Sequence, residues 1–219
     1  MPILCALVYF TPYELMPGVI AMSESIIDLL RSDPIDIDAL EKGFDAASAG
    51  ERIEAIRCFR PRDQRRLFDA AFGRPVTTTD MVPDSAAPLA EVIHEGQNTL
   101  PAFRSFQKRF CLPSKEYQPD DRRVLWGYNH QSFSGITGPG YFVAYDDPEN
   151  SELVIDYREL PPEKPEHWPP ILDNNARLGR FVYAGMVDRL RRVSDHVTIG
   201  RAYKNKPMNA FFTLVRTES

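Results

Sequence analysis

The stretch Trp126–Tyr145 has the sequence WGYNHQSFSGITGPGYFVAY, and it decides the expected fold class. Apolar and polar residues alternate in it up to Phe133, as they do in a strand that is buried on one face. A glycine-rich turn follows, and from Tyr141 the chain continues as a second extended segment. We therefore predict a β-hairpin or a bent pair of strands.

Alternation also assigns the side chains of this stretch to two faces. Successive side chains of a strand point to opposite sides, so Trp126, Tyr128 and His130 share one face while Asn129 and Gln131 share the other. One of these faces is available to line a pocket.

The residues before and after the hairpin differ in their patterns. Over the first 75 residues, four segments (23–30, 36–47, 51–59 and 61–72) carry apolar side chains at helical spacing. Strand-like segments then occur at 124–126, 141–145, 153–157, 181–185, 197–203 and 211–215, with turn signals between them. Consecutive strands with little helix between them indicate an antiparallel meander that curves into a barrel.

We accordingly predict an α+β fold. A helical N-terminal region over residues 1–75 is joined by a proline-rich connector to an antiparallel, barrel-like sheet of the lipocalin or calycin kind over residues 76–219. Residues 94–101 are expected to form a polar turn, and residues 103–110 have helical or bulged spacing. Residues 186–192 are compatible with either a helical turn or an edge strand, and the proline-rich segment 160–175 is expected to be a wrapped loop or lid.

Composition narrows the class of protein. The 219 residues carry a net charge of −5, which argues against nucleic acid as a partner. The three cysteines lie far apart without metal-ligand spacing, so we expect no zinc site and a cytoplasmic location. The short apolar opening segment is interrupted by Pro12 and Pro17, and we predict neither a signal peptide nor a membrane span.

Two C-terminal stretches resemble a known family. The order Asp188–Gly200, followed after a short turn by Ala210–Arg216, looks like the end of the uncharacterised bacterial proteins named for a GXWXG motif. The step Lys108-Arg109-Phe110 is similar to another of their signatures. The resemblance implies a small, β-barrel-like ligand binder with no assigned reaction, and no functional residue carries over from it.

Many aromatic side chains fall in the strand-rich part of the chain. Tyrosine in particular has an apolar body and a hydroxyl that needs a partner, which suits a pocket lined by carbon with a few polar groups. We therefore predict that the chain binds a small, largely apolar or aromatic molecule inside the sheet. The candidate ligand-binding residues are Tyr128, Asn129, His130, Gln131, Tyr141, Tyr157, His94, Asn98 and Arg109.

Two other functions stay open at this point. In a cofactor-independent isomerase, cyclase or lyase, His130 would act as general acid–base while Tyr128 or Asn129 stabilises an oxyanion. In a protein-interaction scaffold, the helical region would bind a partner through the faces that carry Phe44, Ile53 or Phe68. The sequence identifies no ligand, cofactor or haem, does not decide whether a reaction is catalysed, and leaves a homodimer open.

Overall fold

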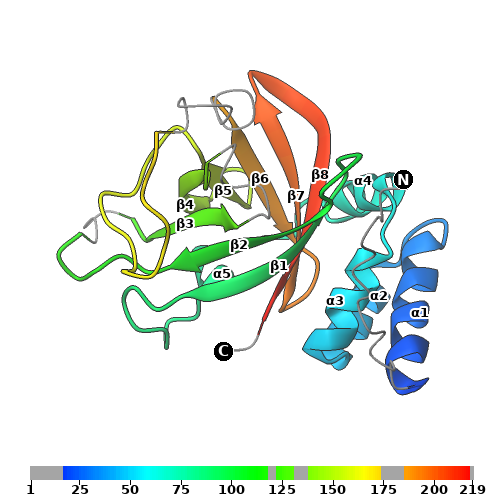
Figure 1. The fold of residues 1–219 in the computed structure, drawn as a ribbon. Helices are drawn as coiled ribbons and strands as arrows, with labels where there is room; N and C mark the ends of the chain where they lie inside the picture. The colour runs from blue at the N-terminus through cyan, green and yellow to red at the C-terminus, as the bar shows by residue number, and fades with distance from the viewer. Residues whose placement is uncertain (1–16, 118–121, 131–137, 174–184, 218–219) are drawn as a thin grey trace, which may run out of the picture.

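The chain folds into a closed, eight-stranded antiparallel β-barrel with helices on one side (Figure 1). The computed structural model describes residues 17–117, 122–130, 138–173 and 185–217. Each strand pairs with the next one along the chain, and β8 pairs with β1 to close the sheet. The strands are β1 (Val92–Asn98), β2 (Ser105–Cys111), β3 (Val124–His130), β4 (Tyr141–Asp147), β5 (Glu152–Asp156), β6 (Val187–Arg192), β7 (Val197–Lys204) and β8 (Lys206–Arg216).

Among the described residues, five helices precede the barrel, and the first four are α1 (Pro17–Arg31), α2 (Ile37–Ala46), α3 (Ala49–Arg57) and α4 (Pro61–Ala70). Their starts follow local sequence signals. The Asp36 side chain accepts a hydrogen bond from the Ala39 backbone N–H at 2.9 Å, and Ser48 forms a capping box with Glu51. Pro61 occupies the first turn of α4, where its missing N–H has no helical partner to lose.

The helices pack on the outside of the barrel, over β7 and β8. Phe44 and Phe68 are buried in a core that also contains Val197 and Phe211 of these two strands, and the Phe68 and Phe211 rings lie 5.6 Å apart. Burying each such ring contributes about 1.5–3 kcal/mol, so the helical region and the barrel stabilise one another. Phe44 and Phe68 are therefore buried in this shared core and do not offer the predicted surface for a protein partner, and Ile53 is partly buried against the same core.

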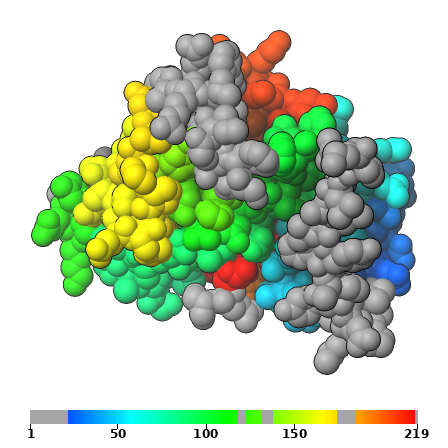
Figure 2. Space-filling view, in the orientation of Figure 1, coloured from blue at the N-terminus to red at the C-terminus, as the bar shows by residue number. Residues whose placement is uncertain are grey.

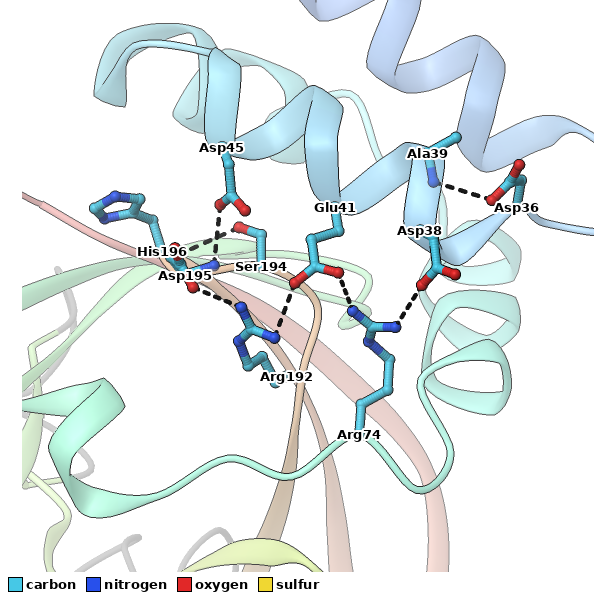
Figure 3. A network of polar contacts seen from close by, with 10 residues as sticks. All are labelled: Asp36, Asp38, Ala39, Glu41, Asp45, Arg74, Arg192, Ser194, Asp195 and His196. Carbon is cyan, nitrogen blue, oxygen red and sulfur yellow. Dashed lines mark hydrogen bonds and ion pairs between the residues drawn. The ribbon is translucent and has the colours of Figure 1, made fainter.

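A network of ion pairs borders this apolar contact (Figure 3). Glu41 of α2 contacts both Arg74, which follows α4, and Arg192 at the end of β6, the latter at 2.8 Å. Arg74 also reaches Asp38 at 2.9 Å, and the Asp195 backbone N–H donates to Asp45 at 3.0 Å. These contacts tie α2 to the β6–β7 end of the barrel.

The short helix α5 (Thr78–Met81) closes the end of the barrel at which β1 begins. Met81 and Val82 join the interior core, and the Thr78 backbone N–H donates to Asp146 of β4 at 2.6 Å. The interior is thus sealed by apolar side chains at this end.

The predicted fold class is confirmed, because helices precede an antiparallel barrel. The interpretation of two segments was wrong, because residues 94–98 and 105–110 belong to strands β1 and β2. The segment that was left undecided forms strand β6 at residues 187–192. The predicted strand 181–185 lies outside the described residues up to residue 184. The division at residue 75 stays a prediction. No helix among the described residues combines the length and apolar character that crossing a membrane requires.

Candidate functional site

Four polar side chains meet inside the barrel. They come from different parts of the barrel wall: Lys108 from β2, Asn129 from β3, Tyr157 from just after β5 and Asp188 from β6. Each is at most 3% exposed. We call these four residues the Lys108 cluster.

Hydrogen bonds join all four members of the Lys108 cluster. The Lys108 ammonium donates to Asn129 Oδ1 at 2.9 Å, to Asp188 Oδ2 at 3.2 Å and to the Tyr157 hydroxyl oxygen. The Tyr157 hydroxyl in turn donates to Asp188 Oδ2 at 3.1 Å and accepts from Asn129 Nδ2 at 3.0 Å. All three ammonium hydrogens therefore have an acceptor within the cluster.

Aromatic rings surround the Lys108 ammonium. Its nitrogen lies 4.9 Å from the ring centre of Phe212, 5.1 Å from Tyr157, 5.3 Å from Phe142 and 5.8 Å from Phe106. Rings at this range attract a cation through their negative faces, which offsets part of the cost of burying the charge.

Glycines on the neighbouring strands leave room for these three phenylalanine rings close to the barrel wall. Each of the three phenylalanines stands opposite an inward-facing glycine of the neighbouring strand, in the pairs Gly96–Phe106, Gly127–Phe142 and Gly200–Phe212. A Cβ atom at any of these glycines would come within 2.6 Å of the paired ring. The missing side chains thus keep the rings out of the middle of the barrel.

A cavity of about 310 Å³ extends from the Lys108 cluster toward the open end of the barrel. It passes Ala202 and Phe212 and ends at a rim where Leu100 is 51% exposed. The full set of lining residues is Asn98, Thr99, Leu100, Phe106, Lys108, Asn129, Tyr157, Met186, Asp188, Ala202, Lys204, Met208, Ala210, Phe211 and Phe212. A pocket of this size, walled mostly by carbon with a few polar groups gathered at one place, is typical of small-molecule sites.

Burial shifts both charged members of the cluster toward their neutral forms. It lowers the pKa of Lys108 and raises the pKa of Asp188, and in each case the opposite charge of the partner counteracts the shift. One carboxylate oxygen takes no part in the network: among the described residues, buried Asp188 Oδ1 has no hydrogen-bond partner. The cluster therefore has one unused acceptor and no unused ammonium donor.

His94 also points into the barrel, but it lies in the sealed half. Its Nε2–H donates to the Met81 carbonyl at 2.9 Å, and its ring packs edge-on against Phe110 at 4.9 Å. Burial lowers the pKa of His94 to about 3, so the ring is neutral at physiological pH. This histidine is a satisfied core group that supports the closed end and does not line the cavity.

The structure brings only some of the predicted site residues to the cavity. Asn129 and Tyr157 are members of the Lys108 cluster, and Asn98 lines the rim, where its Nδ2 donates to the Phe103 carbonyl at 3.2 Å. Arg109 lies on the outer face and pairs with Glu91 at 3.2 Å. Gln131 is outside the described residues.

The expectation that Tyr128 and His130 line the interior is wrong, because Asn129 between them points inward and both therefore point outward. Tyr128 and Tyr141 are buried on the outside of the sheet beneath Trp168, whose ring centre is 4.8 Å from that of Tyr128. His130 is exposed to solvent.

The proline-rich segment that carries Trp168 explains this outer core. It lies across the outside of the barrel (yellow in Figures 1 and 2), and the Tyr141 hydroxyl donates to its Pro169 carbonyl at 2.5 Å. The Trp168 indole N–H donates to Glu91 at 2.6 Å. In its described part, up to residue 173, the segment is a loop as predicted, but it covers the outer face of β3 and β4.

Sequence reasoning missed Lys108 and Asp188 as site residues. A signal for Lys108 was present, since Phe106, Lys108 and Phe110 alternate in one phase of strand β2. The same alternation places Asp188 in phase with Leu190 on β6. A charged residue in the apolar phase of a strand is a sign of a buried polar site.

Comparisons with known proteins give no further assignment. No model of a known family matches this chain, and no curated protein matches it either. Within the described part of the chain, no group of three or more histidine, cysteine, aspartate or glutamate side chains could hold a metal ion. The resemblance to the GXWXG-motif proteins stays a prediction.

Proposed function

We propose that this protein binds a small, largely apolar molecule in the barrel cavity and holds the polar group of that molecule at the Lys108 cluster. The observation that carries the proposal is a cavity of about 310 Å³ whose wall is mostly carbon and whose inner end holds four buried polar side chains. Apolar surface provides affinity in such a site, and the few polar groups fix orientation.

The position of the cluster supports a binding role better than a purely structural one. A buried ion pair contributes little net stability, because desolvation of both charges offsets their attraction. Apolar side chains would fill the middle of the barrel at no such cost, as they do next to α5. The polar residues instead face an empty space that reaches the rim.

Neither alternative function gains a supporting observation. An isomerase, cyclase or lyase that uses His130 as general acid–base needs that ring in the cavity, whereas His130 is exposed on the outer face. A scaffold that binds partners through Phe44, Ile53 or Phe68 needs those side chains accessible, whereas Phe44 and Phe68 are buried in the core that the helices share with the barrel and Ile53 is partly buried against it.

Filling the cavity tests the proposal. Ala202 is buried in β7 and lines the cavity, so Ala202→Leu adds three carbon atoms to the empty space without displacing packed groups. Ala87→Leu is the matched control, since Ala87 is exposed in a turn near the sealed end.

The assay is thermal unfolding with increasing concentrations of 1-octanol, 2-naphthol and their carboxylic acid, ketone and ether analogues. A ligand present at about 100 times its Kd stabilises the folded chain by about 2.7 kcal/mol, which gives a clear shift of the unfolding temperature. We expect the wild type and Ala87→Leu to be stabilised and Ala202→Leu not to be. The proposal is refuted if the compounds stabilise all three proteins equally, or if no compound stabilises the wild type.

A further inference from the structure

We infer that the molecule bound in the cavity is an alcohol or phenol, whose hydroxyl hydrogen is donated to the free oxygen of Asp188. This inference rests on the proposed function and specifies the chemical class of the ligand.

The first step is a count of donors and acceptors at the inner end of the cavity. The three ammonium hydrogens of Lys108 go to Asn129, Tyr157 and Asp188, and the Tyr157 hydroxyl hydrogen goes to Asp188 Oδ2. Asp188 Oδ1 accepts from no group among the described residues, although the side chain is buried and lines the cavity. A buried acceptor without a donor is costly, so the missing group in this site is a hydrogen-bond donor.

The second step concerns charge. A carboxylate ligand would bring a second anion beside Asp188 while the Lys108 donors are already in use, so like charges would repel in a poorly solvated site. An ammonium ligand would place a second cation beside the Lys108 ammonium and would lose its own hydration. A neutral hydroxyl supplies the donor and adds no charge.

The third step concerns access. Rotation of a carboxylate about its terminal torsion has broad, roughly two-fold wells, so a small turn of Asp188 directs Oδ1 into the cavity. The same turn moves Oδ2, so the Lys108 and Tyr157 donors, which contact Oδ2 at 3.2 and 3.1 Å, must follow it. The carbon wall of Phe106, Ala202 and Phe212 then surrounds the apolar part of the ligand.

The experiment compares ligands that differ in one group only. Binding of 1-octanol, 1-methoxyoctane and octanoate, and of 2-naphthol, 2-methoxynaphthalene and 2-naphthoate, is measured by calorimetry on the full chain. A hydrogen bond to a charged group strengthens binding by roughly 10–100-fold, so each hydroxyl compound should bind at least about 10-fold more tightly than its methyl ether and than its carboxylate.

The variant Asp188→Asn gives an independent readout. The amide must direct its oxygen toward the Lys108 and Tyr157 donors, so it presents its NH₂ group where Oδ1 stood. The preference for the hydroxyl compound over the ether should then disappear or reverse. If this variant does not fold, the ligand series on the wild type decides the question by itself.

The outcomes separate the two proposals. If no compound binds, or if Ala202→Leu binds as well as the wild type, the cavity is not a ligand site and both proposals fail. If compounds bind in the cavity but the ether equals the alcohol, or the carboxylate binds most tightly, the proposed function stands and the inference of a hydroxyl ligand is overturned.

Discussion

Replacing Lys108 by methionine should destabilise the fold strongly, and the loss should grow as the pH rises. Lys108 and Asp188 are each about 2% exposed and are paired at 3.2 Å. The variant keeps the length of the side chain but leaves the Asp188 carboxylate buried without a cation. Removing one partner of such a buried pair typically costs about 3–5 kcal/mol of unfolding free energy.

The sign of the pH dependence follows from the Asp188 pKa. Burial already raises this pKa in the wild type, and the loss of the Lys108 charge removes the influence that opposes the shift. A carboxyl group whose pKa is raised by folding stabilises the folded state below its unfolded pKa of about 3.9, and that stabilisation is lost as the pH rises through the folded pKa. Between the wild-type folded pKa and the higher folded pKa of the variant, the variant should lose about 1.4 kcal/mol per pH unit relative to the wild type.

Urea denaturation between pH 4 and pH 7 measures both effects. The double variant Lys108→Met/Asp188→Asn removes both charges and should recover to within roughly 1–2 kcal/mol of the wild type. Lys42→Met, at an exposed position of α2, is the matched control and should change stability by less than about 0.5 kcal/mol. A difference between Lys108→Met and the wild type that is small, or constant across this pH range, would refute the reasoning.

Three further outcomes are expected. Burial lowers the pKa of His94 to about 3 in the folded chain, below its unfolded value, so its contribution to stability is complete above about pH 6.5 and is lost as the pH falls. Between pH 6.5 and pH 5 the free energy of unfolding, measured by denaturation, should therefore fall by about 2 kcal/mol. The variant His94→Gln should not show this fall, whereas the exposed-site control His167→Gln should. Gly200→Ala should destabilise by about 1–3 kcal/mol and weaken ligand binding, because its Cβ would lie 2.3 Å from the Phe212 ring and push that ring into the cavity; unchanged calorimetric affinity would contradict this. Phe68→Ala should lower the free energy of unfolding by about 3–5 kcal/mol. Because the helices and the barrel share a core, the chain should still unfold in one transition, with the same midpoint by far-ultraviolet and near-ultraviolet circular dichroism.

The fold class could be predicted because each of its main elements satisfies a local rule. Strand β8 and the helix α2 have the periodicity expected of them, and Asp36 caps the helix as its position in the sequence suggests. Strands β1 and β2 were harder, because their interior phases contain His94, Gly96 and Lys108, residues that normally indicate turns or surface. Lys108 belongs to the site and His94 to the core of the sealed end, and both obscured the strands.

The interior face of β3 could not be chosen from the sequence. Alternation correctly separated Tyr128 and His130 from Asn129, but it identifies the buried face only when the other face is polar. Six of the seven residues of β3 are buried, because Trp168 and its loop cover the outside of the strand. Trp126, Tyr128 and Tyr141 therefore belong to a second core outside the barrel. Phe106, Phe142 and Tyr157 belong to the core inside it.

The two halves of the barrel interior have different roles. Next to α5 the space is filled by close-packed side chains such as Phe110 and Leu190, together with the neutral His94, and this half provides the stability of the closed sheet. In the other half, glycines opposite the phenylalanines hold the rings against the wall and leave a cavity that begins at Lys108. Because a buried Lys108–Asp188 pair adds little net stability, the apolar packing of the sealed half and of the helices against the barrel supplies the free energy that holds the pair in place. In this pair all the Lys108 donors are in use while one Asp188 oxygen accepts no hydrogen bond from a described residue. Such a pair favours a neutral ligand that donates a hydrogen bond over an anion. The selectivity of the cavity therefore follows from the hydrogen bonds of the Lys108 cluster.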